Sequence, residues 1–209
     1  MPSYAIAPPY NFQNNLNAQL VGLASKAVKA TARTTTPPAV KPADHPEFFR
    51  LPPPEGRSRE STIRLDAGGR FWHEGLPVTH AGLAAALHTW IRRHPDDGRY
   101  ILSNGYDWTY FTVDDAPYFV RSVSLQPDRI MLELSDGSEE EWVPATTWIG
   151  ADDALYAVVK REAPGGPYDA KFTRHAQASL APVLADAGPP AVRIGDRLHV
   201  LGADRTRFG

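Results

Sequence analysis

The adjacent carboxylates Asp114 and Asp115 are the residues whose types and spacing could most directly carry out chemistry. Because two nearby carboxylates repel each other, one of them can retain its proton and act as an acid, or the pair can bind a cation. Neighbouring side chains on a β-strand point to opposite faces, however, so the pair converges only at a bulge. The alternative is a turn in which one aspartate caps backbone amides while Ala116 and Pro117 redirect the chain. We favour the turn and keep a hydrolase that uses Asp114 or Asp115 as the alternative hypothesis.

Aromatic side chains between residues 72 and 156 form a second candidate site. Tryptophan and tyrosine in numbers beyond the needs of a core often line a ligand cleft or a subunit interface. Trp72, Trp108 and Tyr118 with Arg121 would make an apolar pocket with one cation, which suits an acidic small molecule or a peptide. The competing interpretation places these aromatic side chains in the core or in a half-buried sheet. The candidate ligand-binding residues are Trp72, His73, Trp108, Asp114, Asp115, Tyr118 and Arg121.

His73, His80 and His88, together with Glu74, raise the question of a metal site. His80 and His88 are eight positions apart on a predicted helix, which separates them by about 12 Å along the axis. They cannot share one metal ion unless other elements fold between them, so we predict no metal. The sequence also lacks a Gly-x-Ser-x-Gly motif and a glycine loop that leads directly from a strand into a helix. We therefore predict no catalytic residues and no cofactor.

Composition excludes several classes of protein. The chain has 209 residues, a formal net charge of -2 and no cysteine, so disulfides and a cysteine nucleophile are excluded. The balanced charge argues against nucleic acid and anionic membranes as partners. The first residues lack the basic and apolar regions of a secretory signal, and no run reaches the roughly 18 apolar residues of a membrane span. We expect a soluble, cytoplasmic protein whose partner is a small molecule or another protein.

Two helices are predicted among the elements that must position these residues. The first begins after Thr79, which is placed as its cap, and runs to about Arg93. Its apolar face consists of Leu83, Leu87, Trp90 and Ile91. Arg92 and Arg93 suit the negative end of its dipole. The second helix spans residues 173–185, and Pro182 either kinks it or shows that it ends earlier.

Alternating polarity predicts β-strands in the rest of the chain after residue 60. The predicted strands are 62–66, 70–73, 99–102, 106–113, 118–125, 129–134, 139–143, 154–161, 191–194 and 197–201. Gly68-Gly69 and Asn104-Gly105 are typical hairpin turns. Links of two or three residues cannot make parallel crossovers, so we expect an antiparallel meander.

Residues 1–60 differ in texture from the rest of the chain. Repeated prolines and few large apolar residues predict an extension that is mostly disordered. Helical spacing within it indicates one helix at residues 15–33, which docks on its own domain, on a partner subunit or on a membrane surface. The cluster 47–51, with two phenylalanines, is expected to anchor this extension onto the domain.

Two groups of residues resemble a bacterial family of unknown function. Gly69, Phe71-Trp72 and Gly75-Leu-Pro77 match a glycine, an aromatic pair and a Gly-x-Pro step ahead of a helix. The run Phe111-Thr-Val-Asp-Asp-Ala-Pro-Tyr118 matches a second element. On these motifs the chain resembles domain-of-unknown-function family 1285. The resemblance implies two α+β halves built from repeated motifs and a role in signal transduction, without an assigned enzyme activity.

An internal repeat agrees with that implication. Moving the chain by 97 positions places Gly68-Gly69 on Gly165-Gly166 and the helix 81–87 on 178–184. We therefore predict an α+β fold of two similar halves, each a hairpin, helix and hairpin, joined by an antiparallel meander. After the extension, the halves are residues 61–125 and 126–209. The predicted function is a non-enzymatic binding module, a homodimer, with its site where the two halves meet.

Overall fold

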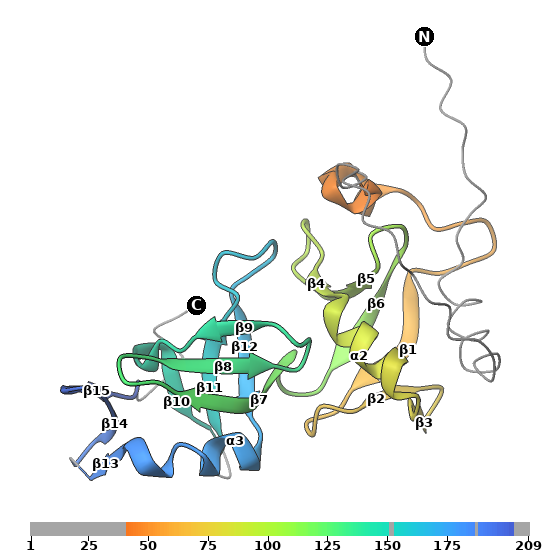
Figure 1. Ribbon diagram of the computed structural model, residues 1–209. Coiled ribbons are helices and arrows are strands. Elements are labelled where there is room, and N and C mark those ends of the chain that lie inside the picture. The colour runs from red at the N-terminus through yellow and green to blue at the C-terminus, as the bar shows by residue number, and fades with distance from the viewer. Residues whose placement is uncertain (1–40, 151–152, 187, 203–209) are drawn as a thin grey trace, which may run out of the picture.

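The computed structural model of the chain describes residues 41–150, 153–186 and 188–202, and these form a mixed α+β fold that is mostly sheet (Figure 1). The first sheet contains β1 (Glu60–Leu65), β2 (Phe71–His73), β3 (Leu76–Pro77), β4 (Ile91–Arg93), β5 (Tyr100–Ser103) and β6 (Trp108–Val113). The second contains β7 (Tyr118–Leu125), β8 (Ile130–Leu134), β9 (Glu139–Glu141), β10 (Thr147–Ile149), β11 (Leu155–Val159) and β12 (Tyr168–Phe172). The third contains β13 (Leu184–Asp186), β14 (Pro190–Ile194) and β15 (Arg197–Val200). The helical elements are α2 (Ala81–Thr89), α3 (Arg174–Ala178) and the 3-10 turns η1 (Pro42–Asp44), η2 (Pro46–Arg50), η3 (Pro144–Thr146) and η5 (Ala181–Val183).

The first sheet has the strand order β3-β2-β1-β6-β5-β4. Its hairpins confirm the sequence prediction, because β1 pairs with β2 across the Gly68-Gly69 turn and β5 pairs with β6 across Asn104-Gly105. The central pair, β1 and β6, is parallel, with Leu65 opposite Val113. Figure 1 shows α2 against this sheet, where Leu87 enters the core.

The second sheet has the order β10-β11-β12-β7-β8-β9 and therefore repeats the same arrangement. Strands β7, β8 and β9 form an antiparallel meander, as predicted. The predicted meander is not continuous, because β6 belongs to the first sheet and β7 to the second, where β7 pairs in parallel with β12, a strand that was not predicted. The link 114–117 carries the chain from the first sheet to the second. The two six-stranded sheets are compatible with two halves, while the repeated hairpin–helix–hairpin unit and the division at 125/126 stay predictions.

The first predicted helix ends earlier than expected. Its cap is His80, whose side chain accepts the Leu83 N–H, rather than Thr79. The helix stops at Thr89, and Ile91 begins β4, where it lies opposite Leu102. Pairing with β5 satisfies the backbone and buries Ile91, so tertiary contacts override the helical spacing. The predicted interaction of Arg92 and Arg93 with the helix dipole is consequently wrong.

The second predicted helix is also shorter. Thr173 caps α3, whose residues 174–178 give way to η5 and then to β13. Pro182 lies in η5, beyond the end of α3. This confirms the alternative in which the helix ends before Pro182 rather than being kinked by it. The hairpin predicted at 191–201 is present as β14 and β15.

The core joins the two six-stranded sheets. One cluster of buried side chains includes Leu65 and Phe71 from the first sheet and Tyr118 and Tyr168 from the second. No helix in the described ranges has the length and apolar character that crossing a membrane requires.

The segment that precedes β1 packs on the first sheet. Phe49 is buried in a smaller cluster with Ile101 and Trp108, and the Ala43 N–H donates to the Gly105 carbonyl over 3.1 Å. The expected anchoring role of residues 47–51 is therefore confirmed. The helix predicted at 15–33 lies outside the described residues.

Candidate functional site

The two six-stranded sheets meet along β4, the edge strand of the first sheet, and we name this contact the seam. The Tyr118 hydroxyl donates to the Ile91 carbonyl over 3.2 Å. The Tyr168 hydroxyl donates to the Pro164 carbonyl over 3.1 Å and accepts the Arg93 backbone N–H. The two tyrosine rings pack edge to face with centroids 5.2 Å apart. Two side chains of the second sheet thus satisfy polar groups on the edge of the first.

A cavity of about 530 Å³ lies beside this seam, and we name it the arginine cavity. Three stretches far apart in the sequence line it: residues 43–49, residues 92–98 and the loop 164–166. Its volume is within the range of small-molecule sites. The same loop crosses closely over β4, because a Cβ on Gly165 would meet the Arg93 nitrogen at 3.2 Å.

The charged groups around the arginine cavity are mostly basic. Arg92, Arg93 and His94 line it, and the one carboxylate among the lining residues is Asp44. Asp44 is used locally, since it accepts the Lys41 N–H over 2.8 Å. The Arg93 guanidinium lies against the rings of Tyr100 and Tyr168, at 5.2 and 5.6 Å from their centroids. Neither arginine forms an ion pair within the described ranges, so the lining carries two positive charges against the one negative charge of Asp44.

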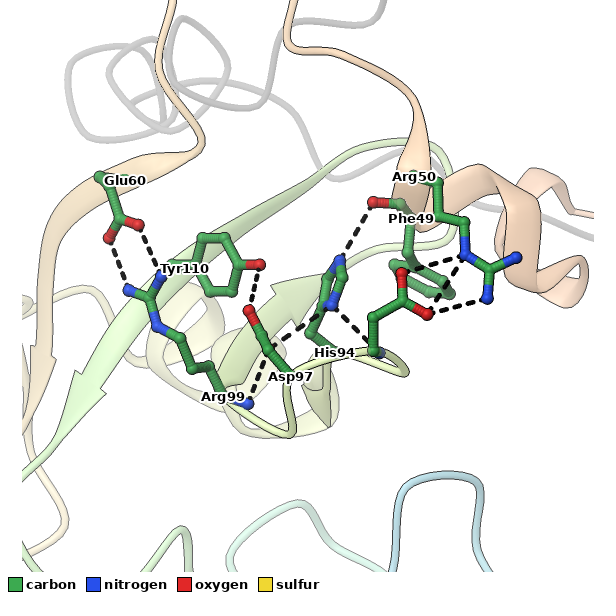
Figure 2. Close-up of polar contacts among 8 residues, drawn as sticks. Phe49, Arg50, Glu60, His94, Asp97, Arg99 and Tyr110 are labelled. Atoms are coloured by element: carbon green, nitrogen blue, oxygen red, sulfur yellow. Dashed lines mark hydrogen bonds and ion pairs between the residues drawn. The ribbon is translucent and has the colours of Figure 1, made fainter.

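His94 lines the cavity. Figure 2 shows its ring beside Phe49, in the segment that precedes β1. Its Nε2 lies 3.1 Å from the Phe49 carbonyl, and its Nδ1 lies 3.3 Å from the Asp96 N–H. A carbonyl can only accept, so Nε2 carries the proton and Nδ1 accepts. The Asp97 carboxylate is 3.5 Å from Nδ1, which is long for a hydrogen bond.

Asp97 is held by other donors. It accepts the Arg99 N–H over 2.9 Å and the Tyr110 hydroxyl over 2.8 Å. Burial alone would raise the pKa of Asp97, but these two hydrogen bonds and the positive charge of Arg99 together lower it. Burial and the Asp97 contact raise the pKa of Tyr110 to about 12. Tyr110 therefore stays protonated and Asp97 stays ionised near neutral pH.

The His94, Asp97 and Tyr110 cluster does not support acid–base catalysis. A catalytic histidine needs one ring nitrogen free to exchange a proton with a nucleophile or substrate. Here Nε2 is committed to the Phe49 carbonyl and Nδ1 to a backbone amide. The cluster instead fixes the segment that covers the cavity, together with the Arg50–Asp96 ion pair at 2.8 Å (Figure 2).

The structure places the predicted site residues Trp72 and His73 on β2, away from the arginine cavity. The Trp72 indole N–H donates to Asp66 over 2.8 Å, and Arg64 and Arg70 lie over its ring at 5.5 and 5.6 Å. His73 Nδ1 lies 3.4 Å from the Thr62 hydroxyl. Both residues hold the hairpin of β1 and β2.

Trp108, Tyr118 and Arg121 do not meet in one pocket either. Trp108 is buried beneath Arg59, whose guanidinium carbon is 4.4 Å from the ring centroid. Tyr118 is buried in the seam, and burial raises its pKa well above the ordinary value. Arg121 is exposed on β7. The aromatic residues thus belong mainly to the core, which was the competing interpretation.

Asp114 and Asp115 point to different partners. Asp114 forms an ion pair with Arg64 of the first sheet. Asp115 accepts from Lys171 over 2.6 Å and from the Tyr156 hydroxyl over 2.9 Å, both in the second sheet. The two carboxylates therefore do not converge, and each ties the link 114–117 to one sheet.

Arg92, Arg93 and His94 were not among the predicted site residues, because helical spacing placed the two arginines at a helix end. One signal was available. Ile91 is β-branched, and the run from Ile91 to His94 is followed by Pro95, a combination that also suits a short edge strand.

The three histidines that raised the question of a metal are used separately. His73 contacts Thr62, His80 caps α2, and His88 is 2% exposed against the Phe71 ring, 4.8 Å away. No three His, Asp or Glu side chains gather as a metal site within the described ranges.

His88 predicts a pH dependence of stability. Burial, and secondarily the charge of Arg121, lowers the pKa of His88 from 6.5 to about 4. Because the folded pKa is below the unfolded one, the unfolded state takes up the proton first as the pH falls. Stability is therefore complete above pH 6.5 and decreases toward pH 4 by about 1.4 kcal/mol per pH unit.

A comparison of wild type with His88→Leu isolates this effect, since both proteins share the other titrating groups. Urea unfolding at pH 7 and pH 5 should show that wild type loses about 2 kcal/mol more than the variant. Equal losses in the two proteins would contradict a neutral, buried His88.

The fold and the seam define an α+β protein of paired six-stranded sheets. No family model and no curated protein matches the sequence. Among solved structures, a DUF1285 family protein (domain-of-unknown-function family 1285) from Silicibacter pomeroyi DSS-3 is similar, with a TM-score of 0.54 and 14% identity over 71% of this chain and 83% of that chain. A second DUF1285 family protein, from Shewanella baltica OS155, shows 20% identity over 56% of this chain and 87% of that chain, with a TM-score of 0.40.

The first of these structures confirms the resemblance that the sequence motifs indicated. At 14% identity the likeness concerns the fold and carries no ligand or activity to this chain. Function has to be argued from the seam itself.

Proposed function

We propose that the chain is a non-enzymatic binding module that holds a small anion, bearing carboxylate or phosphate, in the arginine cavity. The observation that carries the proposal is the run Arg92, Arg93 and His94 along one wall of a 530 Å³ cavity, with neither arginine in an ion pair within the described ranges. Guanidinium groups bind carboxylate and phosphate with paired, charge-assisted hydrogen bonds. A role in signal transduction, which the family resemblance implied, suits a protein that binds without reacting.

The hydrolase alternative has less support. Asp114 and Asp115 are each ion-paired, one with Arg64 and the other with Lys171, and they do not share a site. The expected homodimer stays a prediction, which light scattering of the purified chain checks.

Arg92→Gln is the variant that tests the arginine cavity. Titration calorimetry with inorganic phosphate and with succinate should show binding of at least one anion by wild type. The variant should weaken that binding at least tenfold, or about 1.4 kcal/mol, because it removes the charge while keeping an amide. Arg93 is a poorer choice, since its side chain also packs in the seam.

Arg121→Gln is the matched control, because it removes one exposed arginine from outside the arginine cavity. Its affinity should equal that of wild type. The proposal fails if neither anion binds, or if Arg92→Gln binds as tightly as wild type. If only Arg121→Gln weakened anion binding, the proposal would fail, and the site would lie at Arg121, as the sequence predicted.

A further inference from the structure

A second cavity, of about 780 Å³, lies where the β1–β2 turn meets β12 and α3. Its apolar lining residues are Phe119, Phe172, Ala178, Ala181 and Leu184, and the Phe119 side chain lies on the same face of the second sheet as Lys171. The close approach of the turn depends on glycine, since a Cβ on Gly69 would meet Phe119 at 3.1 Å. The cavity is separate from the arginine cavity, with which it shares no lining residue.

One charged pair beside this cavity is already neutralised. Lys171 lines the cavity, and its Nζ is 2.6 Å from Asp115, which also accepts the Tyr156 hydroxyl. The Asp115 contact raises the pKa of Lys171, and burial raises the pKa of Tyr156. Neither group is therefore activated as a nucleophile or base, and the pair contributes little net charge.

The polar side chains between the charges are also occupied. Thr173 accepts the Ala176 N–H as the cap of α3. Gln177 accepts the Leu155 N–H over 3.2 Å and donates to the Asp153 carbonyl over 2.8 Å. These contacts fix the cavity wall and leave few groups to recognise a ligand.

Arg174 and Asp153 are the charged lining residues that remain. Neither side chain forms an ion pair or a hydrogen bond within the described ranges, and no ion pair joins the two. Both residues are exposed, so the cavity offers one accessible cation, one accessible anion and apolar lining residues between them and the sheet.

We propose that the second cavity binds a short apolar peptide with free termini. Its carboxylate pairs with Arg174, its ammonium group pairs with Asp153, and its side chains pack on Phe119, Ala178 and Leu184. The ligand needs both charges, because a monoanion would leave Asp153 unmatched beside it. A volume of 780 Å³ has room for a dipeptide, whereas a free amino acid would leave much of the apolar lining uncovered.

The test uses L-leucyl-L-phenylalanine and its N-acetyl and C-amide derivatives, each titrated calorimetrically into the full chain. Wild type should bind the free dipeptide at least tenfold more tightly than either derivative. Arg174→Gln should remove the preference for acid over amide, and Asp153→Asn should remove the preference for amine over acetyl. Asparagine suits position 153, whose φ of 55° is in the left-handed region.

The controls are Arg193→Gln and Asp196→Asn, which remove matched exposed charges from the third sheet. They should bind as wild type does, and Ala178→Trp, which fills the cavity from an exposed position, should abolish binding. The proposal is overturned if the dipeptide does not bind at millimolar concentration, if the derivatives bind equally well, or if Ala178→Trp leaves binding intact. Arg92→Gln should not change dipeptide affinity. The proposal for the second cavity can therefore fail or hold independently of anion binding in the arginine cavity.

Discussion

Replacement of Tyr168 by alanine is expected to lower the free energy of unfolding by about 3–5 kcal/mol, the usual range for removing a large buried aromatic side chain. Tyr168 is 2% exposed and packs edge to face on Tyr118. Its ring also supports the Arg93 guanidinium, and its hydroxyl bonds to Pro164. The substitution leaves a cavity in the seam and unsatisfied polar groups beside it. Urea unfolding measures the loss as a lower midpoint with an unchanged slope.

Tyr168→Phe separates the hydroxyl from the ring. It should cost about 1–3 kcal/mol, because it keeps the packing but removes the partner of the Arg93 N–H and the Pro164 carbonyl. A loss below about 1 kcal/mol for Tyr168→Ala would show that the seam is not a stabilising contact. The alanine variant should also weaken anion binding, because Arg93 loses one of its two aromatic supports.

The second large effect is expected from Gly166→Ala, with a loss of about 3 kcal/mol, the upper end of the usual range for overpacking. A Cβ at this position would lie 2.2 Å from the Lys160 carbonyl oxygen and 3.0 Å from that of Ala163. The Lys160 backbone cannot easily move, because its N–H is bonded to Glu140 over 3.0 Å and its Nζ to Asp136 over 2.8 Å. The loop over the arginine cavity must therefore distort. Thermal unfolding followed by circular dichroism gives the loss of stability.

Gly68→Ala is the matched control for this substitution. Gly68 is exposed, and a Cβ there would meet a single atom, the Asp66 side-chain oxygen, at 3.3 Å. We expect a change of less than about 1 kcal/mol. Similar losses in the two variants would mean that the Lys160 contact does not govern the effect.

The local parts of the fold could be predicted from the sequence. The hairpins around Gly68-Gly69 and Asn104-Gly105 follow from the turns that these residues favour. The strands from Tyr118 onward follow from the alternation of polar and apolar side chains. These features depend on residues that are neighbours in the chain. Such signals do not require knowledge of the remaining fold.

The parts that failed depend on distant residues. Helical spacing from Leu83 to Ile91 continued past Thr89, where pairing with β5 turned the chain into a strand. The parallel pairs β1–β6 and β12–β7 join segments separated by whole hairpins, and turn residues carry no information about them.

The site residues divide in the same way. Aromatic residues such as Trp72 and Tyr118 stood out by type, but type does not distinguish a pocket wall from a core. The arginine cavity arises where residues 43–49, 92–98 and 164–166 converge, and no local pattern links these stretches. The prediction that function lies where the halves meet agrees with the position of this cavity at the seam, although its role stays a proposal.

The edge of β4 has a consequence for synthesis of the chain on the ribosome. Its covering side chains, Tyr118 and Tyr168, are encoded after it. At about 5–20 residues per second, several seconds pass between the emergence of β4 and that of Tyr168. During this interval the Ile91 carbonyl and the Arg93 N–H form an open strand edge, the kind of surface through which nascent chains pair with one another. The first sheet therefore keeps one open edge until the second sheet arrives to close it.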